Sequence, residues 1–160
     1  MKRRMIPLTS ILDVQQPVLM AEIRGNESNP LLHGTAIFSP TPMGGVLIQV
    51  EVFYLPDQDL PNHSGFFGMH LHQNGDCQIP FDQTGDHFNP KALPHPEHAG
   101  DFPPLLSGHG YAWMAFYDTR LSIEDIMGRS IVIHGHKDDF SSQPSGMSGE
   151  KIGCGVIIKI

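Results

Sequence analysis

The chain has little charge for its length. Lysine, arginine, aspartate and glutamate together make up 17% of its 160 residues, and the formal net charge is −7 with histidine neutral. Globular domains carry about 25% charged residues. Because binding to a polyanion needs a concentrated basic surface, this balance argues against a nucleic-acid partner. No apolar run approaches the ~18 residues that a membrane-spanning helix needs, so we expect no membrane partner either.

The chain also lacks internal repeats, linkers and a complete secretory signal. We therefore expect a single domain over residues 1–160, with 1–15 as an N-terminal segment. Residues 2–4 are basic, as at the start of a signal peptide, but Pro7, Thr9 and Ser10 interrupt the apolar stretch that should follow, and no cleavage site is evident. This pattern favours a cytoplasmic protein, whereas a chain trimmed of its leader would belong to the cell envelope or be exported.

Cysteine is scarce as well, with only Cys77 and Cys154. In a reducing cytosol two such cysteines are usually free and buried. If they were bridged, loop-closure entropy would stabilise the fold by roughly 4.5 kcal/mol. Their number leaves both states open.

Turn-forming residues, in contrast, are abundant. The 17 glycines and 14 prolines favour a turn-rich all-β protein over a helical bundle. Val46, Ile48, Val50, Val52 and Tyr54 alternate along one face of a long run. We predict strands at 18–25, 33–38, 46–54, 66–72, 111–117, 130–134 and 154–160, with a further strand at 5–12. Short strands separated by turns predict one β-sandwich or barrel.

Two long segments, 74–107 and 136–153, have no such periodicity. Glycine, proline, histidine, serine and aspartate dominate them. Loops of this length are uncommon in compact domains and are usually functional. Residues 122–126 predict one helical turn within another connection.

Histidine is the most informative residue type. The ten histidines equal all the lysines and arginines combined, which suggests metal or proton chemistry. His70 and His72 are two apart on a predicted strand, so their rings point to the same face. His134 ends another predicted strand, which could bring its ring beside them.

A second set lies in the first long loop. His95, His98 and Asp101 follow one another at intervals of three residues, and His87 precedes them. Three nitrogens and one carboxylate oxygen fit the four-coordinate geometry of zinc. Imidazole suits copper and zinc alike, although a set without carboxylate favours copper. If His87 belongs to both sets, its ring must bridge two metals through its two nitrogens.

At this point the sequence resembles the copper/zinc superoxide dismutases, nearer the bacterial branch. The resemblance runs from about residue 30 to the end of the chain. The motifs that carry it are Gly68-Met69-His70-Leu71-His72, Gly75-Asp76-Cys77, Gly85-Asp86-His87-Phe88-Asn89-Pro90, His98-Ala99-Gly100-Asp101, Val132-Ile133-His134 and Gly153-Cys154-Gly155-Val156.

The resemblance implies a fold, two cofactors and a reaction. The fold is a Greek-key, immunoglobulin-like β-sandwich or flattened barrel of about eight antiparallel strands with two long functional loops. Each chain would hold one copper and one zinc ion, superoxide would be the substrate, and the products would be dioxygen and hydrogen peroxide. A homodimer is compatible with the family, whose branches dimerise through different surfaces.

The resemblance also assigns a role to each site residue. Copper would be bound by His70, His72, His87 and His134, and zinc by His87, His95, His98 and Asp101. His87 would serve as bridge and proton relay. Asp138 would orient one copper histidine and one zinc histidine from behind. Cys77 would pair with Cys154, against the reduced state usual in a cytosol.

Three features depart from the family pattern. Lys151 stands where the family has an arginine; it keeps the charge that attracts an anion but loses the planar fork, which predicts lower efficiency. The spacing from His95 to His98 is short, so the zinc loop is trimmed. Met147 lies in the channel loop, either narrowing the approach to copper or simply exposed.

The other histidines and the function leave alternatives. Three histidines match no ligand position, and we expect them on the surface or in turns: His33, His63 and His109. His136 would face the site only if its strand continued past Gly135. An enzyme is favoured by the complete ligand sets. Lys151 and Met147 make plausible a metal-binding protein with little turnover, such as a copper reservoir.

Overall fold

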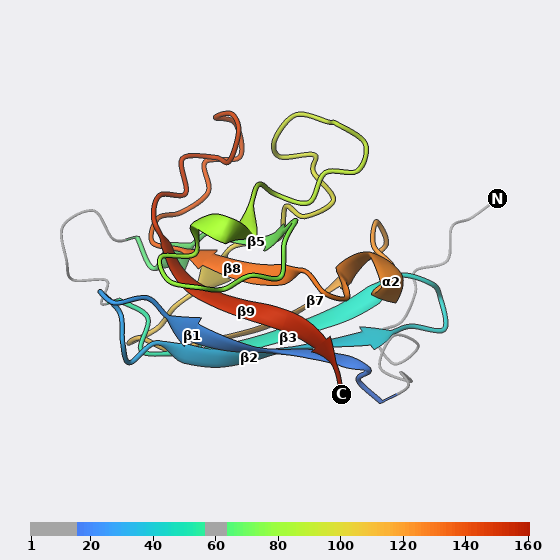
Figure 1. Ribbon diagram of the computed structural model, residues 1–160, viewed down its shortest axis with the longest axis horizontal. Coiled ribbons are helices and arrows are strands. Elements are labelled where there is room, and N and C mark those ends of the chain that lie inside the picture. Colours follow the sequence, from blue (N-terminus) through green and yellow to red (C-terminus); the bar gives the residue numbers. More distant parts are fainter. Residues whose placement is uncertain (1–15, 57–63) are drawn as a thin grey trace.

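Strands dominate the computed structural model of the protein, which describes residues 16–56 and 64–160 (Figure 1). The helical elements in this part are one 3-10 turn, η1 (Asp82–Thr84), and one short helix, α2 (Ile123–Ile126). The strands are β1 (Leu19–Gly25), β2 (His33–Pro40), β3 (Val46–Phe53), β4 (Phe66–Phe67), β5 (Met69–His72), β6 (Leu105–Leu106), β7 (Ala112–Asp118), β8 (Ser130–His134) and β9 (Lys151–Lys159).

Seven of these strands form one antiparallel sheet in the order β5-β8-β9-β1-β2-β3-β7, and β4 pairs with β6 in a small second sheet. The large sheet curls, so β5 and β8 lie over β2 and β3 (Figure 1). The core fills the space between these layers, with Phe38 and Ile48 from one layer and Leu71, Ile131 and Ile133 from the other fully buried. The prediction of an all-β sandwich or flattened barrel is confirmed.

The alternation predicted for the third run is confirmed along β3. Ile48, Val50 and Val52 are buried in the core, while the residues between them are partly exposed. Burial of one face of a pleated strand is what a period of two residues produces. Tyr54 was predicted on this face and is not there: its φ of 57° turns the chain after Phe53, and its side chain is exposed.

Most other strand boundaries differ from the prediction by a few residues. The predicted strand 66–72 is divided at Gly68, whose N–H donates to the carbonyl of His136 in the last long loop. The last strand begins three residues early, at Lys151, and β6 lies within the predicted loop 74–107. The predicted strand 5–12 falls outside the described residues.

Both long loops extend from the side of the molecule where β5 and β8 lie, away from β1 and β2 (Figure 1). The predicted helical turn is α2, which Ser122 caps by accepting a hydrogen bond from the backbone N–H of Asp125. Neither helical element in the described ranges has the length and apolar character to cross a membrane.

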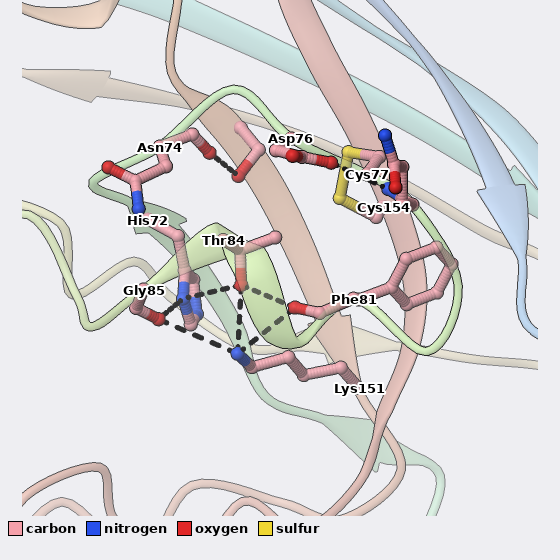
Figure 2. Close-up of a disulfide and its surroundings, with 11 residues drawn as sticks. His72, Asn74, Asp76, Cys77, Phe81, Thr84, Gly85, Lys151 and Cys154 are labelled. Carbon is pink, nitrogen blue, oxygen red and sulfur yellow. Dashed lines mark hydrogen bonds between the residues drawn. A yellow bond between two sulfur atoms is a disulfide. The ribbon is translucent and has the colours of Figure 1, made fainter.

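A disulfide joins Cys77, in the loop after β5, to Cys154 in β9, with their Cα atoms 5.7 Å apart (Figure 2). The pairing implied by the family resemblance is confirmed. The bond closes a loop of 77 residues and attaches the segment before η1 to the sheet. It therefore limits how far this segment can move from β9.

Removing the disulfide should destabilise the metal-free protein. We expect Cys77→Ser together with Cys154→Ser to lower the free energy of unfolding by about 3–4 kcal/mol, because the unfolded chain gains loop entropy. Urea denaturation measures this, and reduced wild-type protein, which has the same open loop, is the control. A loss below about 1 kcal/mol would contradict the expectation.

Candidate metal centre

Two histidines of the site come from β5 and a third from the end of β8. His70 and His72 lie on β5, which pairs with β8 so that His72 is opposite Ser130. His134 closes β8 at a bulge, where it pairs with Lys151 of β9. All three histidines are at least 97% buried. The sheet therefore brings them together as the sequence predicted.

The free edge of β5 is covered by two pieces of the first long loop. The backbone N–H of Leu71 donates to Gly100, and the carbonyl of Leu71 accepts from Phe88. Bridges between His72 and His87 and between His70 and Asp101 extend this pairing. Gly100 permits the close approach, since a Cβ there would lie 2.9 Å from the N atom of Phe88. This pairing places loop residues beside strand residues that precede them by 15 to 31 positions.

The first set of donors, which we call the four-histidine group, has its ligand atoms within 4.8 Å of one another. Two of these histidines use Nδ1 for a hydrogen bond to a backbone carbonyl. Nδ1 of His72 lies 2.8 Å from the carbonyl of Gly85, and Nδ1 of His134 lies 3.2 Å from the carbonyl of Gly149. Their Nε2 atoms are 3.3 Å apart. The members are His70, His72, His87 and His134.

The second set, the histidine–aspartate group, meets the same distance limit. Nδ1 of His87 lies 2.7 Å from Asp101 Oδ1 and 3.4 Å from Nδ1 of His98. The Nδ1 atoms of His95 and His98 lie 3.1 and 3.2 Å from Asp101 Oδ2. The members are His87, His95, His98 and Asp101.

His87 belongs to both groups. Its Nδ1 is turned to Asp101, while its Nε2 is buried with no hydrogen-bond partner. Nδ1 of His70 and Nδ1 of His95 are likewise buried without a hydrogen bond. A buried polar atom left unpaired is costly. Nε2 of His87 and Nδ1 of His70 are two such atoms, and Nδ1 of His95 has only the Asp101 carboxylate 3.1 Å away, so together they indicate metal sites.

Asp138 contacts one histidine of each donor group from the second long loop. Its two carboxylate oxygens face Nε2 of His70 at 2.7 Å and Nε2 of His95 at 2.8 Å. Oδ1 also accepts from the backbone N–H of Phe140 at 2.7 Å. Gly146 lets the loop close here, because its φ is +68° and a Cβ would collide with Asp138. One carboxylate thus links a ring of each group.

Burial controls the protonation of the strand histidines. It lowers the pKa of His70 to about 4, against the opposing effect of the hydrogen bond that His70 donates to Asp138, and it lowers the pKa of His134 to about 3. The pKa of His72 is lowered by burial too. Burial raises the pKa of Asp138, but the hydrogen bonds from His70 and His95 outweigh it and the net shift is downward. Neutral rings and an ionised carboxylate are the forms that suit metal ligation.

Asp101 follows the same logic. Burial raises the pKa of Asp101, but the hydrogen bond from His87 and the charges of His95 and His98 lower it by more. The net effect holds the pKa of this carboxyl below its usual range. A turn joins His98 to Asp101. The backbone N–H of Asp101 donates to the carbonyl of His98, and the backbone N–H of His98 donates to Asp101 Oδ2 at 2.9 Å. The short spacing from His95 to Asp101 therefore still forms a complete donor set.

Lys151 lies at the start of β9, beside the four-histidine group (Figure 2). Its ammonium donates to Thr84 Oγ1 at 2.8 Å, and a cavity of about 400 Å³ includes Lys151, His72, His87 and His134 in its lining. Burial lowers the pKa of Lys151, opposed by the charges of Asp82 and Asp86. The structure thus places the Lys151 ammonium in the lining of the cavity that contains three residues of the four-histidine group.

Three functional contacts escaped sequence reasoning. Arg120 donates to the carbonyls of His98 and Asp101, at 3.0 and 2.8 Å, and thereby holds the turn between these two donors. Gln143 accepts from the N–H of His95 and donates to its carbonyl, which joins the two long loops. Thr84 anchors Lys151. These residues belong to no ligand motif, so only the distances reveal them.

The remaining residues of interest lie outside both donor groups. Met147 is 73% exposed and does not line the cavity, so it does not narrow the approach. His136 is exposed, and strand β8 has ended at His134 before it. His33 stacks on Phe53, with ring centroids 5.2 Å apart, and His109 lies in a turn with φ 53°. His63 lies outside the described residues.

The comparisons with known proteins agree with this geometry. The model of the family "Copper/zinc superoxide dismutase (SODC)" matches residues 32–157. A superoxide dismutase [Cu-Zn] of Deinococcus radiodurans is 33% identical over 173 residues, covering 94% of this chain and 90% of the relative. The chain belongs to the copper/zinc superoxide dismutase family.

Solved structures give the same picture. The Cu/Zn superoxide dismutase of Brucella abortus is 25% identical, with a TM-score of 0.68 over 86% of this chain and 97% of its own. A superoxide-dismutase-like protein from Bacillus subtilis is also 25% identical, with a TM-score of 0.72 over 86% of this chain and 96% of its own.

Neutralising Asp138 should weaken metal binding. An asparagine offers one acceptor where the carboxylate offers two, so in Asp138→Asn one of His70 and His95 loses its partner. We expect the affinity for zinc and copper to fall about 10- to 100-fold, as measured by competition with a chelator. Asp139→Asn, which removes an exposed carboxylate bonded to Ser141 and Ser142, is the matched control. Affinities within twofold of wild type for Asp138→Asn would refute this role.

The metal-free protein should lose stability on mild acidification. His70 has a folded pKa of about 4 against 6.5 in the unfolded chain, so the unfolded state binds more protons between these values. The free energy of unfolding should therefore fall as the pH drops from 7 to 4, by about 3 kcal/mol from His70 alone. Denaturant titrations at several pH values measure this. Metal-loaded protein should show a shallower dependence, and an equally steep one would contradict the explanation.

Proposed function

We propose that the protein dismutates superoxide at a copper ion held by the four-histidine group and a zinc ion held by the histidine–aspartate group. The observation that carries this proposal is the position of His87, which belongs to both donor groups, with its Nδ1 turned to Asp101 and its Nε2 buried without a hydrogen bond. A set made only of imidazoles suits copper, and a set with three imidazoles and one carboxylate suits zinc. Membership of the copper/zinc superoxide dismutase family supports the same pair of metals.

The reaction consumes two superoxide ions and two protons. A copper ion held by His70, His72, His87 and His134 would supply the one-electron redox chemistry by which one superoxide is oxidised to dioxygen and the other, with the two protons, is reduced to hydrogen peroxide. Zinc is redox-inert. His87 is suited to carry a proton for the second half-reaction, because its Nδ1 is held by Asp101 while its Nε2 has no hydrogen-bond partner and is left to take one up.

The rest of the site orients these groups and attracts the substrate. Asp138 fixes His70 and His95 through their outer nitrogens. The mouth of the cavity carries Lys151, which offers a positive charge to a small anion on an otherwise acidic protein. Asp86 also lines the cavity and works against this attraction. We therefore expect turnover with reduced anion steering.

Reconstitution tests the proposal directly. Protein loaded with one equivalent each of copper and zinc, verified by elemental analysis, should accelerate the decay of superoxide, whereas protein loaded with zinc alone should not. Equal decay in the two samples, with both metals shown to be bound, would refute the enzyme and favour a protein that stores or handles copper.

Lys151 should control the rate through its charge. We expect Lys151→Ala to lower the rate constant for superoxide about three- to tenfold and to flatten its dependence on ionic strength, because a charge near the reaction site steers the anion. Lys159→Ala removes the same charge from the exposed other end of β9 and is the matched control. Equal rates and equal salt dependence in the two variants would contradict this role.

A further inference from the structure

The Lys151 ammonium has three acceptors, and all of them come from one short segment around η1 (Figure 2). Thr84 Oγ1 is 2.8 Å away, while the carbonyls of Phe81 and Gly85 are 3.3 and 3.5 Å away. Hydrogen bonds from N–H to oxygen usually span 2.7–3.2 Å. The hydroxyl of Thr84 is therefore the only one of the three at full hydrogen-bond distance.

The Thr84 hydroxyl is itself fixed in orientation. Thr84 is completely buried, and its Oγ1 donates its single proton to the carbonyl of Phe81 at 2.8 Å. Its backbone N–H bonds to the same carbonyl. With its proton committed, the hydroxyl presents lone pairs to Lys151 on one side and, at 3.4 Å, to Nδ1 of His72 on the other. It can only accept from the ammonium.

This anchor sits between two histidines of the four-histidine group. Lys151 pairs with His134 across β8 and β9, and Gly85, the lysine's most distant acceptor, also accepts from Nδ1 of His72. A lysine has a long flexible stem and one charged nitrogen, so without an anchor its charge is free to move outward into the cavity. An arginine has five donors in a planar fork and can bond to two backbone carbonyls by itself.

We propose that Thr84 is a positioning residue that holds the Lys151 charge at the mouth of the four-histidine group, giving a lysine the fixed placement that an arginine obtains from its own fork. The inference rests on the proposed role of Lys151 in attracting the substrate. It predicts a dependence between positions 84 and 151: the hydroxyl is needed when residue 151 is lysine and dispensable when it is arginine.

Azide, a small monovalent anion that binds copper(II), is the probe for this dependence. Protein loaded with copper and zinc is titrated with azide at pH 7 and the copper absorption band is followed. We expect Thr84→Val to raise the azide Kd about three- to tenfold, because the charge is no longer held in place. Thr84→Ser, which restores the hydroxyl, should stay within twofold of wild type.

The same substitution in a second background separates positioning from packing. In Lys151→Arg protein, Thr84→Val should change the azide Kd less than twofold. An unchanged Kd in the lysine background, or an equal increase in both backgrounds, would overturn the proposal. Metal content and thermal unfolding are measured for each variant, and Thr84→Ala replaces the valine variant if that one fails to load copper.

Superoxide decay measured on the same wild-type sample keeps the two proposals apart. The azide series decides the role of Thr84 whether or not superoxide is consumed. Normal decay with no effect of Thr84→Val refutes only the positioning role, and absent decay with the expected azide series refutes only the enzymatic function.

Discussion

The sharing of one imidazole ring between two sets of donors is the constraint on which the site depends. His87 is buried, and its ring lies 3.8 Å from that of His70 and 5.5 Å from that of His98, measured between centroids. With Nδ1 turned to Asp101 and Nε2 unpaired, the ring can satisfy both nitrogens only through partners on opposite sides. The two groups must therefore keep a fixed spacing, and the surrounding loops have to be rigid.

The structure supplies this rigidity from three directions. Backbone pairing of the first long loop with the edge of β5 fixes the positions of His87 and Asp101 beside this strand. Asp138 joins one ring of each group from the second loop. The disulfide between Cys77 and Cys154 ties down the segment that carries the acceptors of Lys151. The first two supports come from parts of the chain distant in sequence from the donors they fix.

The sequence was sufficient to predict strands β3 and β8. One-sided burial leaves a period of two that is visible in β3, whereas β8 is buried along its whole length and its signal is the continuous apolar run Ile131–Ile133. The members of the two donor groups could be named from the sequence because His-x-His on a strand and the ordered motifs are local signals. The disulfide was not, since the number of cysteines left both states open and only the family resemblance implied the pairing. Thr84, Arg120 and Gln143 were missed because their roles depend on contacts between segments with no shared motif. Tyr54 was placed wrongly because a positive φ ends the strand one residue early.

The most direct test of this account is a crystal structure of the protein loaded with oxidised copper and zinc. We predict one ion at about 2.0–2.1 Å from Nε2 of His87 and a second at the same distance from Nδ1, each completed by the other members of its group. A structure in which His87 binds a single ion, or in which either ion lies outside these donor groups, would contradict the central claim.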